Sequence, residues 1–317
     1  MVKKMTKTQA SLSVVLGVIV WAVLGYVLAV ALQAVVGLLL GKLFAAGIGE
    51  TVYLMFGYLI AYITIVRLAP LPQKKKRQMM MIGLLSGWAL SSFFIIQLFV
   101  GFILSAMAQM GVDFSGVDST LFTTIVSAIC YVLTLAVVIG VPWVAWKRRA
   151  TQNEIGLQRL PTWGELGLAP LGFVVYLITS AVVVYLVTKF VPAFDVKQVQ
   201  EIGFSQLGTR LEYILAFFIL VIVAPVAEEI LFRGYLYGKM QKYIPWWGAA
   251  LVTSALFGLA HGQWNVAIDT FILGMFLATL RTITGSLWPS ILLHMIKNGV
   301  AYYFLFINPT FINTLGG

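Results

Sequence analysis

The sequence predicts an all-α protein, a polytopic transmembrane bundle of about nine helices, on three observations of its composition. Of the 317 residues, 61% are hydrophobic and only 10% are charged, and the mean hydropathy is +0.96. In an average soluble domain about a quarter of the residues are charged, so this chain lacks the charge to cover a soluble surface. The composition excludes soluble enzymes and nucleic-acid-binding proteins, and we expect no nucleic-acid partner despite the net charge of +10.

Nine apolar segments are interpreted as membrane spans, because a helix needs about 20 apolar residues to cross a bilayer. They lie near residues 11–40, 51–69, 79–107, 120–146, 171–191, 211–242, 246–262, 266–281 and 287–306. The first four form a predicted N-terminal accessory region, residues 1–150. The polar stretch 151–170 is a connector, either an interfacial segment or a solvated loop. Residues 171–317 form the predicted core.

Basic residues are concentrated in alternate loops of this arrangement. The clusters are Lys3 to Lys7, Lys74 to Arg77, Lys147 to Arg149, and Lys239 with Lys242. The loops between them carry few basic residues and contain Glu50, Asp113, Asp118, Asp195 and Glu201. Because cytoplasmic loops of membrane proteins collect Lys and Arg, we expect a cytoplasmic N-terminus.

The last third of the chain places ionisable side chains inside predicted spans, where each one is costly and indicates a function. These ionisable side chains, together with a phenylalanine and an asparagine, occur in three segments: AEEILFRG, FGLAHG and LLHMIKN. The residues are Glu228, Glu229, Arg233, Phe257, His261, His294 and Asn298. The two histidines are the only ones in the chain.

Helical spacing predicts how these residues are oriented. Residues four apart share a helix face, so Glu229 and Arg233 are expected to pair, and Glu228 points elsewhere without an obvious local partner. At 1.5 Å per residue, Glu228 and His261 lie roughly 20 Å from the same membrane side. We therefore expect one buried site, approached from the cytoplasm.

The residue types in this site suit hydrolysis of a peptide bond inside the membrane. A carboxylate in apolar surroundings is a usable base near neutral pH, so Glu228 beside His261 would deprotonate and orient a water. His294 and Asn298 would then donate hydrogen bonds to the developing oxyanion. These four are the candidate catalytic residues. The supporting residues are Glu229, Arg233 and Phe257.

A metal centre is the alternative interpretation of the same residues. Glu228, His261 and His294 would make a His₂Glu set with one open position, which is typical of zinc. The local H-E-x-x-H motif is absent, so every ligand would come from a different helix. Spacing does not decide between one divalent metal such as zinc and no cofactor, and we slightly favour the metal-free version.

The motifs E-E-x-x-x-R, F-x-x-x-H and H-x-x-x-N, in this order, resemble those of the CPBP intramembrane protease family. This family includes type 2 CAAX prenyl proteases and Abi-like bacterial proteins linked to bacteriocin processing and self-immunity. The sharp resemblance covers residues 228–298, and a looser one covers 170–306. It implies an endopeptidase in which Glu228 and His261 activate water while His294 and Asn298 bind the oxyanion. The substrate does not carry over from the family. We expect a membrane-associated or small secreted peptide or protein as substrate, and a bacterial or archaeal plasma membrane as the location.

Two other functions remain open at this point. A non-catalytic scaffold would bind and position a partner membrane or cell-envelope enzyme through helices in 1–150. A transporter would use Glu and His to relay protons. Substitutions in the motifs would leave a scaffold working, whereas they would stop proton-coupled uptake in a transporter.

Overall fold

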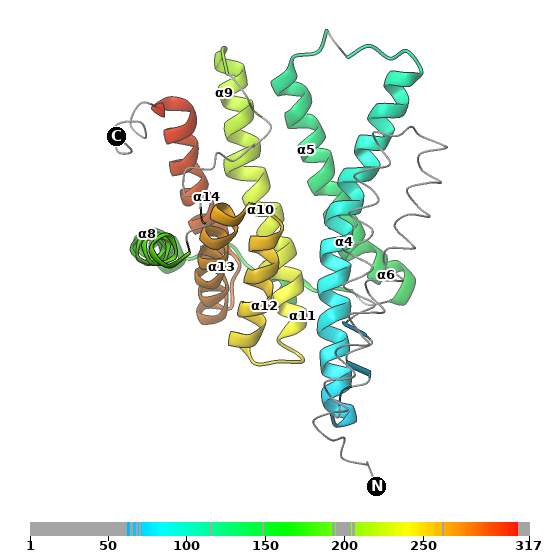
Figure 1. The fold of residues 1–317 in the computed structure, drawn as a ribbon, viewed down its shortest axis with the longest axis vertical. Helices are drawn as coiled ribbons and strands as arrows, with labels where there is room; N and C mark the ends of the chain where they lie inside the picture. Colours follow the sequence, from blue (N-terminus) through cyan, green and yellow to red (C-terminus); the bar gives the residue numbers. More distant parts are fainter. Residues whose placement is uncertain are drawn as a thin grey trace. The chain divides into compact units, whose positions relative to one another are not determined.

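The computed structural model describes residues 62–63, 66–67, 69, 71–114, 116–147, 149–191, 194, 204, 207–261 and 263–309. The first predicted span lies outside the described residues, as does most of the second. Contacts within the chain divide it into two units, residues 1–113 and residues 114–317, which are described separately below. In the described residues the regular structure is helical, with no β strand (Figure 1).

The first unit contributes one long described helix, α4 (Gln73–Gln109). It begins directly after Pro72, so the basic run from Lys74 to Arg77 forms its first turn and is not a loop as the sequence suggested. Two buried hydroxyls on this helix donate to carbonyls four residues earlier, Ser86 to Ile82 and Ser92 to Trp88. These bonds satisfy the serines within their own helix.

The second unit contains the remaining helices. They are α5 (Ser119–Leu135), η2 (Ala136–Gly140), α6 (Val141–Trp146), α7 (Gln152–Ile155), α8 (Trp163–Phe190), α12 (Trp246–Leu259), α13 (Trp264–Thr284), α14 (Trp288–Tyr302) and η5 (Tyr303–Ile307), together with the long helix described next. Across the described chain, six helices are long and apolar enough to cross a membrane, and α12, with 14 residues, is shorter. The predicted all-α, multi-pass membrane bundle is confirmed.

The long helix from Arg210 to Met240 alternates α and π turns. Its parts are α9 (Arg210–Phe217), η3 (Phe218–Val223), α10 (Ala224–Glu229), η4 (Ile230–Leu236) and α11 (Tyr237–Met240). In a π turn each carbonyl accepts from the N–H five residues on, and such turns are frequent at functional sites. Pro225, near the start of α10, has no N–H, so the regular α-helical hydrogen bonding cannot continue through this position.

Threonine and glutamate define the starts of three helices. In each, the Thr hydroxyl accepts from the Glu backbone N–H and the Glu carboxylate accepts from the Thr N–H, which is a capping box. The pairs are Thr151 with Glu154, Thr162 with Glu165, and Thr209 with Glu212. The second box starts α8 at Trp163, eight residues before the predicted span, and leaves Pro170 inside the helix. A proline is tolerated there because neighbouring groups in membrane bundles satisfy the freed carbonyl.

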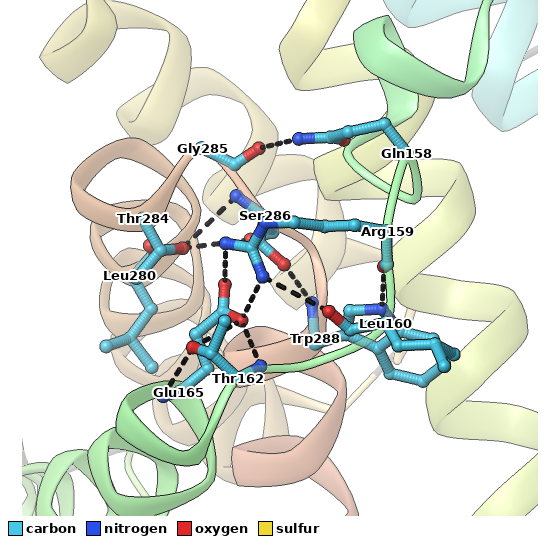
Figure 2. A network of polar contacts seen from close by, with 10 residues as sticks. All are labelled: Gln158, Arg159, Leu160, Thr162, Glu165, Leu280, Thr284, Gly285, Ser286 and Trp288. Carbon is cyan, nitrogen blue, oxygen red and sulfur yellow. Dashed lines mark hydrogen bonds and ion pairs between the residues drawn. The ribbon is translucent and has the colours of Figure 1, made fainter.

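The connector predicted at 151–170 is bound to the ends of the core helices. Figure 2 shows Arg159 donating twice to the Glu165 carboxylate, at 2.6 and 2.8 Å. The Trp288 indole donates to the Arg159 carbonyl at 2.7 Å, and Gln158 donates to the Gly285 carbonyl at 3.3 Å. These contacts hold the turn between α13 and α14, and with it the start of the helix that carries His294.

Glu154 joins the connector to the end of the long helix. Its carboxylate accepts from Lys239 at 2.8 Å and also from Lys242. Burial alone would raise the pKa of Glu154, but the hydrogen bonds from the two lysines outweigh it and lower the pKa to about 2. Glu154 therefore stays ionised across the physiological range.

The core of the second unit lies where the long helix meets α12, α13 and α14. Figure 1 shows these helices gathered together, and α8 also packs against α13 and α14. The largest fully buried side chains here are Arg233, Tyr237, Phe232 and Phe257. A charged residue at the centre of this apolar core needs a partner, and that partner is part of the candidate site.

Candidate active site

An ion pair between Glu229 and Arg233 occupies the centre of the core. Arg233 Nη1 lies 2.7 Å from Glu229 Oε1, and both side chains are 0% exposed. The guanidinium also lies 4.2 Å from the centroid of the Phe257 ring, a cation–π contact. The pair that helical spacing predicted is therefore formed, and an aromatic ring covers its positive partner.

Gly274 on α13 allows that helix to pass directly over Arg233. A Cβ added at this position would lie 2.6 Å from Arg233 Nη2 and 2.8 Å from Ser254. Real Cβ atoms essentially never approach this closely, so one of the neighbours would have to move. Glycine is required here by close packing, and no motif identified it.

His294 on α14 lies between the two glutamates. Its Nδ1 is 3.0 Å from Glu229 Oε1, and its Nε2 is 3.8 Å from Glu228 Oε2. An ionised carboxylate can only accept hydrogen bonds. Nδ1 of His294 is therefore the protonated nitrogen, and its N–H donates a hydrogen bond to Glu229. The ring is thereby oriented with its second nitrogen facing Glu228.

The Glu228 carboxylate has a neighbour on each oxygen. Tyr131 on α5 donates its hydroxyl to Oε1 at 2.9 Å, and His294 faces Oε2. The side chain is 13% exposed. The residue for which the sequence offered no partner is thus held by helices from two distant parts of the chain.

His261 follows the last turn of α12. Its Nδ1 lies 2.8 Å from the carbonyl of Phe257, one of the terminal carbonyls that the helix itself leaves unpaired. With Nδ1–H donating to that carbonyl, Nε2 is the acceptor nitrogen of the ring. The Phe257 ring packs edge-on against both histidines, with ring centroids 4.9 Å from His261 and 5.6 Å from His294. Glu228 is close enough to act electrostatically on the His261 ring.

Asn298 has a structural contact that the motif did not predict. Its Nδ2 donates to the Leu220 carbonyl in η3 at 2.9 Å. In this π segment Ala224 N–H bonds to the Ile219 carbonyl, so the next donor in the series would be residue 225. That residue is Pro225, which has no N–H, and the Asn298 amide supplies the missing donor. The amide carries a second N–H that this bond does not use.

The described residues do not assemble a metal site. Within the described ranges, no group of three His, Cys, Asp or Glu side chains could hold a metal ion. Glu228, His261 and His294 therefore do not form the His₂Glu set in this structure. Because the donors do not fit a metal, no step below is derived through one.

A second polar cluster lies outside the motifs. Asp269 on α13 accepts from Tyr176 and Ser180 of α8, both at 2.6 Å, and lies 3.8 Å from Lys297 of α14. These bonds tie three helices together. Lys297 precedes Asn298, and its charge acts on His261.

The structure brings most of the predicted residues to one place and leaves one apart. Glu228, Glu229, Arg233, Phe257 and His294 are linked by the contacts above, and His261 packs at their edge. Asn298 lies one turn beyond His294, and its side-chain amide donates to the Leu220 carbonyl. Tyr131 is the contacting residue that sequence reasoning missed, because a tyrosine in an apolar run has no signal that separates it from an ordinary core residue.

Comparison with known proteins gives a match over the same helices. The family model described as type II CAAX prenyl endopeptidase Rce1-like matches residues 210–300. The chain is 35% identical over 89 residues to an uncharacterized 24.3 kDa protein of Escherichia coli, covering 26% of this chain and 41% of that protein. It is 28% identical over 98 residues to the membrane-embedded CAAX protease MroQ of Staphylococcus aureus, covering 29% of this chain and 40% of that protein. The chain thus spans less than half the length of these relatives. No solved structure matches.

Proposed function

Because residues 210–300 belong to the CPBP family of intramembrane proteases, as the match to its Rce1-like model shows, we propose that this chain is an intramembrane endopeptidase. The resemblance carried by the three motifs is thereby confirmed. The observation that carries the proposal is the Glu228 carboxylate, only 13% exposed and held between Tyr131 and His294 in a membrane bundle. The proposed substrate is a membrane-associated or small secreted peptide or protein.

Glu228 acts as the general base in this proposal, with His261 beside it. The carboxylate removes a proton from water while the water oxygen attacks the peptide carbonyl carbon, and the carbonyl electron pair moves to its oxygen. The protonated Glu228 then gives its proton to the amide nitrogen as the C–N bond breaks. The products are a carboxylic acid and an amine. Water is consumed, and Glu228 returns to its starting state.

His294 and Asn298 are the proposed donors to the oxyanion. His294 already donates from Nδ1 to Glu229, so donation from Nε2 requires a proton on both ring nitrogens. The ion pair of Glu229 with Arg233 positions His294 through that bond. Asn298 donates with the N–H that its bond to Leu220 leaves available. Removing one such donor costs about 10²–10³-fold in kcat in other acyl-transfer enzymes.

The topology is also part of the proposal. The positive-inside pattern places the N-terminus in the cytoplasm and opens the site to that side. The bilayer surrounds the apolar helices, and residues 1–150 are proposed to hold any membrane partner protein. The predicted boundaries of the accessory region, connector and core remain predictions, although α5 packs with the C-terminal unit.

Purified protein with fluorescein-labelled casein, an unfolded polypeptide, tests the proposal. We expect cleavage by the wild type, loss of cleavage in Glu228→Gln and His261→Ala, and an unchanged rate in EDTA. Glu212→Gln is the matched control, because it removes a carboxylate at the far end of the same long helix. Full cleavage by both site variants would refute the assignment. Motif variants that behave as wild type in cells, combined with defects from substitutions in 1–150, would indicate the scaffold instead.

A further inference from the structure

Tyr131 is the one described contact of Glu228 that comes from outside the family-matched segment. It lies on α5, well before residue 210, where the family match begins. Its hydroxyl donates to Glu228 Oε1 at 2.9 Å, within the range of a good hydrogen bond. On the other side of this carboxylate, His294 Nε2 lies 3.8 Å from Oε2, beyond hydrogen-bond distance.

Tyr131 lies on a helix, α5, that packs along the long helix carrying Glu228. α5 contacts α9, η3 and α10. Asp118 at the start of α5 lies beside Glu212 at the start of α9, and Tyr131 meets Glu228 further along. Asp118 and Tyr131 are 13 residues apart, which corresponds to about 20 Å of helix, and Glu212 and Glu228 are 16 residues apart, about 24 Å. The helices therefore run side by side in the same direction, which fixes the depth of Tyr131.

We infer that Tyr131 is a positioning residue for Glu228 and that α5 therefore belongs to the active site. The inference rests on the proposed function of Glu228 as the base. A hydrogen bond donated to a carboxylate favours its ionised form, which is the form that a base requires. Because the phenol occupies Oε1, Oε2 is the oxygen that takes the proton from water. Oε2 is also the oxygen that faces His294.

The first test is the pH dependence of casein cleavage by the purified full-length protein. The other ionisable groups that face Glu228 or act on it are Arg233 from η4, His261 after α12 and His294 from α14. Tyr131→Phe removes only the hydroxyl. We expect kcat/KM to fall about tenfold at neutral pH. We also expect the acidic limb of the pH–rate profile to move up by about one pH unit.

A merely structural role for Tyr131 would lower the rate equally at every pH and leave the limb in place. Tyr185→Phe is the matched control, because Tyr185 lies on membrane helix α8 and the residue is 65% exposed. This control is expected to match the wild type. A Tyr131→Phe profile that overlays the wild type, or falls in parallel with it, would overturn the inference.

The second test needs no substrate. 3-Fluorotyrosine placed at residue 131 by amber suppression reports its surroundings through its ¹⁹F resonance. We expect that resonance to shift in Glu228→Gln and to stay in place in Glu212→Gln, since Glu212 lies about 24 Å along the helix. An unshifted resonance in Glu228→Gln would show that the phenol does not contact the carboxylate.

The two tests separate the inference from the function on which it rests. If Glu228→Gln cleaves casein as the wild type does, the proposed function fails, whatever the fluorine signal shows. If Glu228→Gln is inactive while Tyr131→Phe is unchanged in rate and pH profile, the function stands and the inference fails.

Discussion

Substituting Asn298 by alanine separates two roles that this side chain is expected to have. The Leu220 carbonyl would lose the donor at 2.9 Å that replaces the N–H missing at Pro225. The oxyanion would lose its proposed second donor. One role concerns the stability of the fold and the other concerns only the reaction, so the two can be measured separately.

The magnitude of the stability effect follows from the unpaired carbonyl. A buried acceptor left without a partner costs about 1–3 kcal/mol. The surrounding helices are apolar, and Asn298 is only partly exposed, so water replaces the lost donor poorly. We expect Asn298→Ala to lower the free energy of unfolding by about 2 kcal/mol.

A second substitution tests the origin of this loss. Pro225→Ala restores a backbone N–H at the position whose acceptor in the π series is Leu220. We expect the double variant Asn298→Ala/Pro225→Ala to regain most of the lost stability. Its casein cleavage is expected to stay low, by about 10²-fold or more, because a backbone N–H inside the helix cannot replace the oxyanion donor.

The assay is reversible unfolding in mixed micelles, titrated with SDS and followed by tryptophan fluorescence, alongside kcat on casein. Each variant is compared with Pro225→Ala alone, which is expected to be as stable as the wild type or more so. A loss of stability in Asn298→Ala that Pro225→Ala fails to restore would refute the π-helix account. Recovery of activity together with stability would refute the oxyanion role.

Three further predictions use the same unfolding assay. Arg233→Met leaves Glu229 as a buried charge without its partner and is expected to lower the free energy of unfolding by about 3–5 kcal/mol. The double variant Glu229→Gln/Arg233→Met is expected to recover most of this loss. A double variant no more stable than Arg233→Met would contradict the prediction. Gly274→Ala is expected to cost about 1–3 kcal/mol, because its Cβ collides with Arg233, whereas Gly101→Ala, which meets nothing within 4 Å, is expected to be neutral or slightly stabilising. Glu154→Gln is expected to lower the free energy of unfolding slightly at neutral pH. Because the pKa of Glu154 is lowered from 4.5 to about 2 in the folded protein, its contribution is complete above pH 4.5 and is lost as the pH falls towards 2. A difference from wild type that persists unchanged at the acid end would contradict the ion pairs with its two lysines.

The helices were predictable because membrane spans are set by the length of apolar sequence. The seven predicted segments between 79 and 306 each coincide with a described helix. The predicted span 171–191 begins eight residues after the true start of α8 at Trp163. The Thr162–Glu165 capping box, a local signal that was readable in the sequence, sets the true start.

The site was predictable where one helix supplies both partners, as Glu229 and Arg233 do at a spacing of four. Contacts between distant helices depend on packing that local patterns do not contain. Tyr131 reaches Glu228 across 97 residues, and Asn298 reaches Leu220 across 78. A tyrosine or an asparagine in an apolar span is compatible with many partners, so neither contact could be inferred from spacing.

Mass spectrometry of membrane peptides tests the central claim, hydrolysis of a peptide bond by Glu228, most directly. Membranes from cells that carry only Glu228→Gln would be incubated with purified wild-type or Glu228→Gln protein. The account predicts that new peptide termini appear with the wild-type protein alone and that EDTA does not prevent them. Identical peptides in both incubations would contradict it.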